Sequence, residues 1–88
     1  MRVYYLRKGE NKFGVKYEIW KFSRSLFLGE RYQFVQYSHS FHSIVDYLKG
    51  SLKQGDIINI EELNATERIG LENLVDKYKI KIEENEKT

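Results

Sequence analysis

Alternation of apolar and polar residues dominates the first 37 positions and restricts them to extended structure. It is clearest in residues 13–22, FGVKYEIWKF, where every second residue from Phe13 to Ile19 is apolar. Successive side chains of a β-strand point to opposite faces of a sheet, so this pattern predicts a strand with one buried face. The expected core set is Phe13, Val15, Tyr17 and Ile19, and the other face carries Gly14, Lys16, Glu18 and Trp20.

Two further stretches alternate in the same way. Residues 2–8 and 31–37 are each predicted to form a strand. The sequence GENK, between the strands predicted at 2–8 and 13–22, is expected to be a hairpin loop, because Gly9 and Asn11 tolerate positive φ. The segment SRSLFLGE is either a loop or a short extra strand that turns at Gly29. The first half of the chain is therefore predicted to be an antiparallel meander.

The second half changes to a helical period. A helix is predicted over about 40–52, with Ser40 as its N-cap. Its apolar stripe consists of Phe41, Ile44, Val45, Leu48 and Leu52. A second helix is predicted over about 65–77, where Asn64 and Glu67 have the spacing of a capping box. Its stripe consists of Leu71, Leu74, Val75 and Tyr78, although Gly70 in its first half lowers the helix propensity by about 1 kcal/mol relative to alanine.

Short strands are predicted on either side of this second helix, at 56–63 and 78–83. The order is then β-β-β-α-β-α-β, and the last three elements have the length of a βαβ unit with parallel strands. We expect an α+β fold, in which residues 1–83 form a single small domain. One mixed sheet with an antiparallel N-terminal meander would carry both helices on one face. Residues 84–88 are expected to be a polar, disordered tail.

The composition narrows the possible chemistry and location. The absence of cysteine excludes disulfides, thiolate catalysis and cysteine-bound metals. The N-terminus is not expected to be a signal peptide, and no apolar run has the roughly 18 residues of a membrane helix, so we expect a cytoplasmic protein without a membrane partner. The absence of proline and the many Lys, Glu, Ile, Asn and Tyr residues indicate an AT-rich genome, such as that of a phage or virus. For a viral protein, the expected location is the cytoplasm of the host.

Charge is distributed unevenly along the chain. Residues 1–37 have eight basic and three acidic side chains, a net charge of +5, whereas residues 38–88 have a net charge of −3. The basic half is also rich in aromatic residues, which is typical of sheets that stack nucleic-acid bases. The leading hypothesis is a non-enzymatic module that binds RNA or DNA through its N-terminal sheet. The predicted phosphate contacts are Arg2, Arg7, Lys12, Lys16, Lys21, Arg24 and Arg31, and the predicted stacking residues are Tyr4, Trp20 and Phe22. Against this, aromatic residues are also good strand formers that fill small cores.

A second hypothesis is a protein-binding inhibitor or adaptor, of a kind that a phage or virus could encode. Leu26, Phe27 and Leu28 are consecutive apolar residues in a segment that should be exposed. They would either pack inward or form a protein interface. A homodimer is a further possibility, because small sheets leave edges that pair.

The third hypothesis is a small nuclease or hydrolase that uses His39, His42 and Asp46. Their spacing lacks the specificity of a metal-binding motif, and the apolar stripe of the predicted helix turns His42 and Asp46 away from the core. A solvated helix face is the simpler interpretation. No metal, cofactor or phosphate-binding loop is predicted, since KGSLKQG lacks the ending and the preceding strand of a P-loop.

Overall fold

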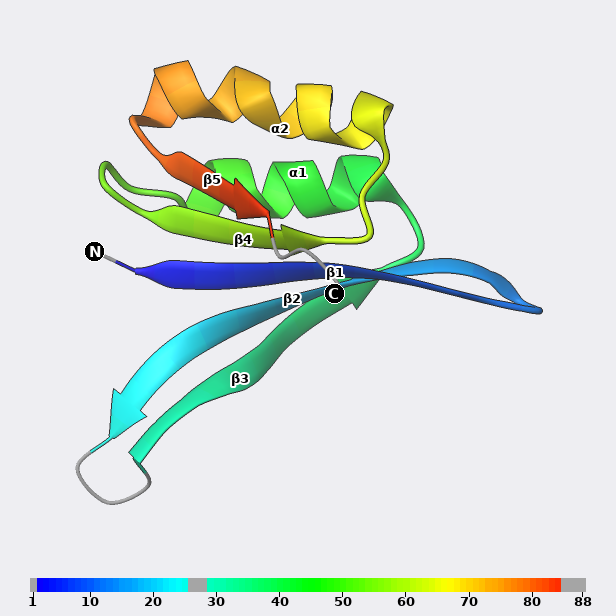
Figure 1. Cartoon of the computed structure of the whole chain (residues 1–88), viewed down its shortest axis with the longest axis horizontal. Coiled ribbons are helices and arrows are strands. Elements are labelled where there is room, and N and C mark those ends of the chain that lie inside the picture. The colour runs from blue at the N-terminus through cyan, green and yellow to red at the C-terminus, as the bar shows by residue number, and fades with distance from the viewer. Residues whose placement is uncertain (1, 26–28, 85–88) are drawn as a thin grey trace.

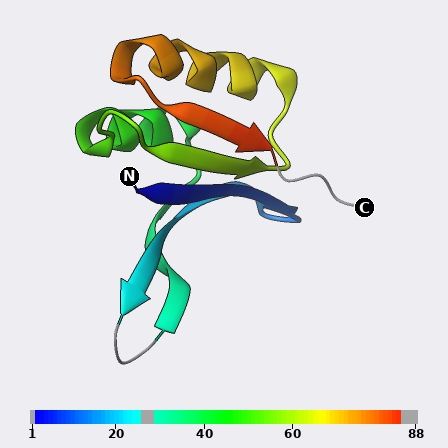
Figure 2. The same cartoon turned by 60° about the vertical axis from the view of Figure 1, so that its left-hand side comes forward.

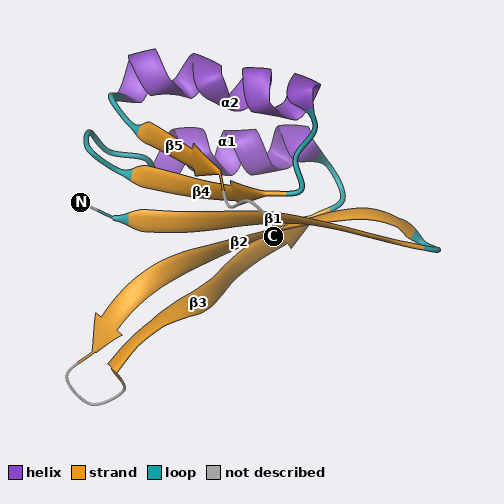
Figure 3. Cartoon of the chain, in the orientation of Figure 1, coloured by secondary structure: helices purple, strands orange, loops and turns teal. Residues whose placement is uncertain are grey.

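The computed structural model describes residues 2–25 and 29–84, which form five strands and two helices (Figure 1 and Figure 3). In chain order these elements are β1 (Val3–Asn11), β2 (Gly14–Ser25), β3 (Gly29–Ser38), α1 (Phe41–Ser51), β4 (Ile57–Glu61), α2 (Ala65–Tyr78) and β5 (Lys81–Glu84). The predicted order of elements is confirmed. Within the described ranges, no helix is long and apolar enough to cross a bilayer.

The strands form one mixed sheet with the order β3-β2-β1-β4-β5. Strands β1, β2 and β3 are antiparallel neighbours, whereas β4 runs parallel to β1 and β5 runs parallel to β4. Both helices lie on the same face of the sheet (Figure 2). The predicted α+β architecture is therefore confirmed. The long connection through β2, β3 and α1 returns the chain to the free edge of β1, so that the N-terminal strand becomes the centre of the sheet.

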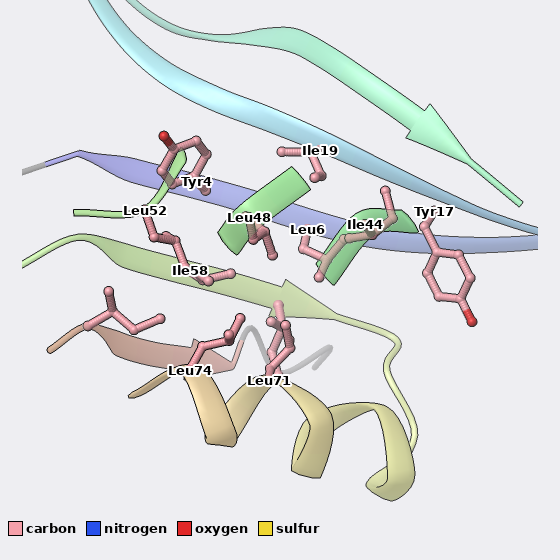
Figure 4. Close-up of a cluster of buried hydrophobic side chains, with 12 residues drawn as sticks. Tyr4, Leu6, Tyr17, Ile19, Ile44, Leu48, Leu52, Ile58, Leu71 and Leu74 are labelled. Atoms are coloured by element: carbon pink, nitrogen blue, oxygen red, sulfur yellow. The ribbon is translucent and has the colours of Figure 1, made fainter. Parts of the chain in front are cut away.

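The core lies between this sheet and the helices (Figure 4). Leu6 of β1 is paired with Ile19 of β2 on one side and with Ile60 of β4 on the other, and all three are buried. Alternation in each strand therefore delivers every second side chain to the helices. The helices pack their predicted apolar stripes against these side chains, and Ile44, Leu48 and Leu71 of the stripes are fully buried. Burial of each such side chain contributes about 1.5–3 kcal/mol.

Helix α2 begins at the predicted capping box. The Asn64 side chain accepts a hydrogen bond from the Glu67 backbone N–H at 2.8 Å, and the Glu67 carboxylate accepts one from the Asn64 N–H at 3.0 Å. Gly70 faces α1, where an added Cβ would lie 3.4 Å from the ring of Phe41. The glycine that weakens the helix thus marks its close approach to α1.

The first hairpin turns later than predicted. Strand β1 continues to Asn11 through the predicted GENK loop, and Asn11 pairs with Gly14 around a tight turn. The Asn11 side chain accepts the Phe13 N–H at 2.8 Å, and Gly14 supplies the positive φ of 119°. Phe13 is consequently 83% exposed in the turn, and its predicted place in the core is wrong.

The last predicted strand also begins later. Residue Tyr78 belongs to α2, because it lies one turn after Leu74 on the same apolar stripe. Lys79 then breaks the helix in the left-handed conformation with φ 57°, and β5 starts at Lys81. Strand β4 is likewise shorter than predicted, because the side chain of Asp56 turns inward before it and Glu62 has a φ of 66° after it.

The hairpin of β2 and β3 extends beyond the rest of the sheet (Figure 1). Strand β2 pairs with β1 only as far as Lys21, so its residues from Phe22 onward pair with β3 alone. The register shifts between Ile19 and Trp20, where Val35 forms a bulge in β3. The segment SRSLFLGE thus continues β2 to Ser25 and starts β3 at Gly29, whose φ is 75°. The predicted interface residues Leu26, Phe27 and Leu28 lie outside the described residues.

Candidate binding surface on the uncovered face of the sheet

Six aromatic side chains gather on the sheet face that no helix covers. Leu6 and Ile19 point toward the helices, so their neighbours Tyr5 and Trp20 point to the opposite side. The register of β3 adds its aromatic residues to the same side. We call this set the aromatic face: Tyr5, Trp20, Phe22, Tyr32, Phe34 and Tyr37. The predicted outward positions of Trp20 and Phe22 agree with this arrangement.

Contacts between these rings hold the aromatic face together. Trp20 and Phe34 meet edge to face at 5.3 Å between centroids, and Phe22 meets Tyr32 in the same way at 5.4 Å. Tyr37 stacks on Phe34 at 6.4 Å. Even so, Tyr32, Phe34 and Tyr37 remain 41%, 47% and 53% exposed. The rings therefore have fixed positions and free surface, as a preformed binding surface requires.

A shallow hollow of about 360 Å³ opens between β1, β2 and β3 on this face. Its walls are the rings of Tyr5, Trp20 and Tyr32 and the side chain of Arg7. Tyr5 and Tyr32 are in tilted contact with each other, with centroids 5.7 Å apart. The hollow offers an apolar seat for one planar or branched group, with a cation at its rim.

Charges on the uncovered face nearly cancel. Two predicted ligand-binding cations lie here: Arg7 on β1, and Lys16, whose ammonium lies 4.7 Å from the ring centroid of Tyr37. Arg7 has an acidic cross-strand neighbour on each side, Glu18 and Glu61. By strand register, the described side chains of this face comprise three bases and four acids: Arg7, Lys16, Lys81, Glu18, Glu30, Glu61 and Glu83. The face is therefore aromatic without being strongly basic.

Three of the other predicted ligand-binding residues lie on the opposite side. Tyr4 is 1% exposed in the core beneath the helices, so the prediction that it stacks on a ligand is wrong. Tyr4 lies two residues before buried Leu6 in β1, so the two side chains point to the same, helix-facing side of the sheet. Lys21 pairs with Tyr4 across the strands and shares its side of the sheet. Arg31 also faces that side, because its neighbour Tyr32 belongs to the aromatic face.

Arg2 has a structural partner. Its guanidinium forms an ion pair with Asp56 at 3.0 Å and donates to the Ser51 carbonyl, while its backbone N–H donates to the same carboxylate. Asp56 is 2% exposed and also accepts the Lys53 N–H. Burial alone would raise the pKa of Asp56, but these hydrogen bonds and the Arg2 charge hold it below its usual value. The guanidinium is therefore engaged in joining β1 to the chain before β4.

One further predicted cation lies away from the uncovered face, and another is not described. Lys12 is in the turn of the first hairpin, with its ammonium 5.0 Å from the ring centroid of Phe13. The side chain of Arg24 lies outside the described part of the chain. The structure thus brings Arg7 and Lys16 together with Trp20 and Phe22, and does not bring Arg2, Lys12, Lys21 or Arg31 to the same surface.

The three residues of the hydrolase hypothesis have separate environments. His42 and Asp46 form an exposed pair one helical turn apart, with 3.3 Å between Nε2 and Oδ2. His39 precedes α1, where its Nδ1 lies 3.0 Å from the Val15 carbonyl and its ring meets the edge of Tyr37. In the ranges covered by the structure, no three His, Cys, Asp or Glu side chains are grouped to hold a metal.

A buried polar cluster was not anticipated from the sequence. Glu67, which is 7% exposed, accepts hydrogen bonds from the Tyr17 hydroxyl and from Lys8 Nζ, the latter at 3.0 Å. Burial would raise the pKa of Glu67, but these donors and the Asn64 N–H lower it. Burial and the adjacent carboxylate raise the pKa of Tyr17 to about 12. The capping box fixed the place of Glu67, but only the strand register brings Lys8 and Tyr17 to it.

Both buried polar clusters have complete hydrogen bonding, since no described buried side-chain N or O atom lacks a partner. Such clusters orient secondary structure and do not need a ligand to satisfy them. The aromatic face is the opposite case, because large apolar rings there remain exposed. It is therefore the candidate functional surface. Comparison of the chain with protein-family models, curated proteins and solved structures finds no match.

Proposed function

We propose that this chain is a non-enzymatic protein-binding module, such as a small inhibitor or adaptor, and that the aromatic face is its contact surface. The observation that supports this most directly is the set of six aromatic rings on the sheet face that the helices leave uncovered. A chain of 88 residues has few large apolar side chains to spare from its core. Their exposure is a cost that binding to a partner removes.

The residue types of this face match the centres of protein interfaces. Tyr, Trp and Arg are enriched at the centres of protein interfaces, where they contribute most of the binding energy, and these are the residue types that line the hollow at Arg7 and Trp20. The ring contacts keep them in place before binding, which reduces the entropy lost on association. Charged side chains surround the rings and supply a polar rim, as at Lys16 and Glu18.

Charge favours a protein over a nucleic acid as the partner. Nucleic-acid binding draws most of its affinity from basic side chains that contact phosphates. Among the described side chains, the uncovered face has three bases and four acids, and Arg2, Lys21 and Arg31 lie elsewhere. Mixed charge of this kind suits a protein surface, where both signs find partners.

Two outer-face variants, Trp20→Ser and Phe34→Ser, test the proposal. We expect wild-type protein to retain a stoichiometric partner protein in nuclease-treated extracts of the cells that produce it, and both variants to lose that partner. Ile69→Ser is the matched control, because Ile69 is 61% exposed on α2, on the helical side of the molecule. Retention of the same partner by both aromatic variants would refute the aromatic face as the contact surface.

Single-stranded nucleic acid is a second candidate, favoured by the hollow lined by Tyr5, Trp20 and Tyr32 with Arg7 at its rim. An unpaired base could stack there while Arg7 and Lys16 contact phosphates. With two such contacts, log Kd should change with log salt by a slope of only about 1.4. Fluorescence anisotropy with mixed-sequence oligonucleotides measures this slope, and no binding at low salt would eliminate the candidate.

A further inference from the structure

Strand β3 is a free edge of the sheet over its whole length, Gly29–Ser38. Among the described strands its only partner is β2, so about half of its backbone N–H and C=O groups point away from the sheet. The bulge at Val35 divides this edge, and the segment Gly29–Phe34 before the bulge is regular and lies in the protruding part of the hairpin. That segment has the geometry that accepts an additional strand.

The two faces of this protruding hairpin differ in chemistry. One face belongs to the aromatic face, through Phe22, Tyr32 and Phe34. The other face is basic and polar, with Lys21 and Arg31 beside Gln33. Among the described side chains of the hairpin from Lys21 onward, this second face has no acidic residue. A strand added along β3 would therefore meet rings on one side and positive charge on the other.

We propose that the edge of β3 binds an extended segment of a partner protein in which acidic and apolar residues alternate. The inference deepens the proposed function and rests on it. Main-chain hydrogen bonds to β3 would supply affinity for any extended segment. Alternation would supply specificity, since apolar side chains of the segment lie against Tyr32 and Phe34 while its acids lie beside Arg31. Lys21 adds positive charge to the same side from β2, one strand further in.

A second copy of this chain is a poorer occupant of the same edge. Antiparallel pairing of β3 with itself would place Arg31 and Gln33 of one copy beside the same residues of the other, with no acid to neutralise them. Like charges that face each other across strands are destabilising. The Val35 bulge also interrupts a ladder that would have to continue through it.

Three fluorescent peptides of about ten residues test the proposal, a length that matches a typical strand. The first alternates glutamate and valine, the second has the same composition in two blocks, and the third alternates lysine and valine. We expect the first to bind wild-type protein in anisotropy titrations about tenfold more tightly than either of the others. Equal binding of all three, or binding of none, would overturn the proposal.

Charge reversal at the edge provides the specific control. In Arg31→Glu, which changes an exposed side chain, the preference should invert toward the lysine–valine peptide. Unchanged preference would overturn the assignment to β3, and so would a dimer in light scattering that excludes the peptides. If the peptides fail while Trp20→Ser and Phe34→Ser still lose the cellular partner, the aromatic face binds proteins without strand addition. If those variants keep the partner, the proposed function itself is wrong.

Discussion

The hydroxyl of Tyr17 donates a hydrogen bond to the carboxylate of Glu67, and this contact joins β2 to the first turn of α2. The two residues are separated by 50 positions in the sequence. Glu67 also completes the capping box and pairs with Lys8 of β1. One carboxylate therefore fixes the helix start against two central strands of the sheet.

Replacement of this carboxylate should be costly. Glu67→Gln leaves Lys8 without its charged partner in a half-buried site and weakens the cap, so we expect a loss of about 2–4 kcal/mol in the free energy of unfolding. Urea unfolding at neutral pH measures the loss. Glu72→Gln, an exposed change in the same helix, should stay within about 0.5 kcal/mol of wild type. Equal effects of both variants would contradict the role of Glu67.

Alkaline pH should loosen the same contact. The pKa of Tyr17 is raised from 10.0 to about 12 in the folded protein, so its stabilising contribution is complete below pH 10. That contribution is lost as the pH rises through about 12. Tyr17→Phe should therefore have a shallower fall in unfolding free energy over this interval than wild type. Tyr37→Phe, which removes an exposed hydroxyl, should keep the wild-type slope, and an unchanged slope in Tyr17→Phe would refute the coupling.

The ion pair of Arg2 with Asp56 should have the opposite pH dependence. The pKa of Asp56 is lowered in the folded state, so its contribution is present above the unfolded value of 3.8 and is lost as the pH falls through the folded value. Arg2→Met should cost about 2–4 kcal/mol at neutral pH, since it leaves a buried carboxylate without its cation. Chemical unfolding as a function of pH should show this cost shrinking in acid, whereas exposed Arg31→Met should cost less than about 0.5 kcal/mol throughout.

Gly70 offers a test of helix packing. Alanine improves helix propensity by about 1 kcal/mol, and its Cβ would lie 3.4 Å from the Phe41 ring, in ordinary contact. Gly70→Ala should therefore raise the midpoint of thermal unfolding. A larger side chain has no such space, so Gly70→Leu should lower it by separating α2 from α1. The order alanine above glycine above leucine is the expected result, and a midpoint for leucine above that of glycine would show that the helices are not in contact here.

Rings of the aromatic face should contribute little to stability. Phe34 is 47% exposed, so we expect Phe34→Ser to cost about 1 kcal/mol, whereas Leu48→Ala in the core should cost about 2–5 kcal/mol. Urea unfolding of the two variants measures the difference. Comparable losses would mean that the aromatic face is part of the fold and is not reserved for a partner.

Periodicity was sufficient to predict the element order and which apolar side chains of each helix face the core, but it did not predict the burial of Glu67. The stripe from Phe41 to Leu52 and the cap at Asn64 are local patterns, and local patterns are visible in a sequence. The turn of the first hairpin was misplaced because Gly9 satisfies turn preferences as well as Gly14 does, and only the pairing of Leu6 with Ile19 decides between them.

Assignment of residues to the two sheet faces was harder. Basic residues in the first half looked like one surface because they are close in sequence, yet alternation divides Arg7 and Lys16 from Lys21. The bulge at Val35 then resets the alternation of β3, and a bulge leaves no signal in composition. Arg2 pairs with Asp56 because β1 and β4 are adjacent in the sheet. This adjacency follows from the strand order and cannot be read from either segment alone.

The central place of β1 also bears on how the chain folds during synthesis. The two N-terminal hairpins can form as soon as residues up to Ser38 have left the ribosome, since their pairings are local. The helix-facing side of β1 remains bare until α1 and α2 are made, because Leu6 belongs to one buried cluster with Ile44, Leu48 and Leu71. A nascent chain of this protein therefore exposes apolar side chains on both sides of its first sheet. The elements made after Ser38 end the exposure of the helix-facing side to chaperones and aggregation, whereas the aromatic face stays uncovered in the finished fold.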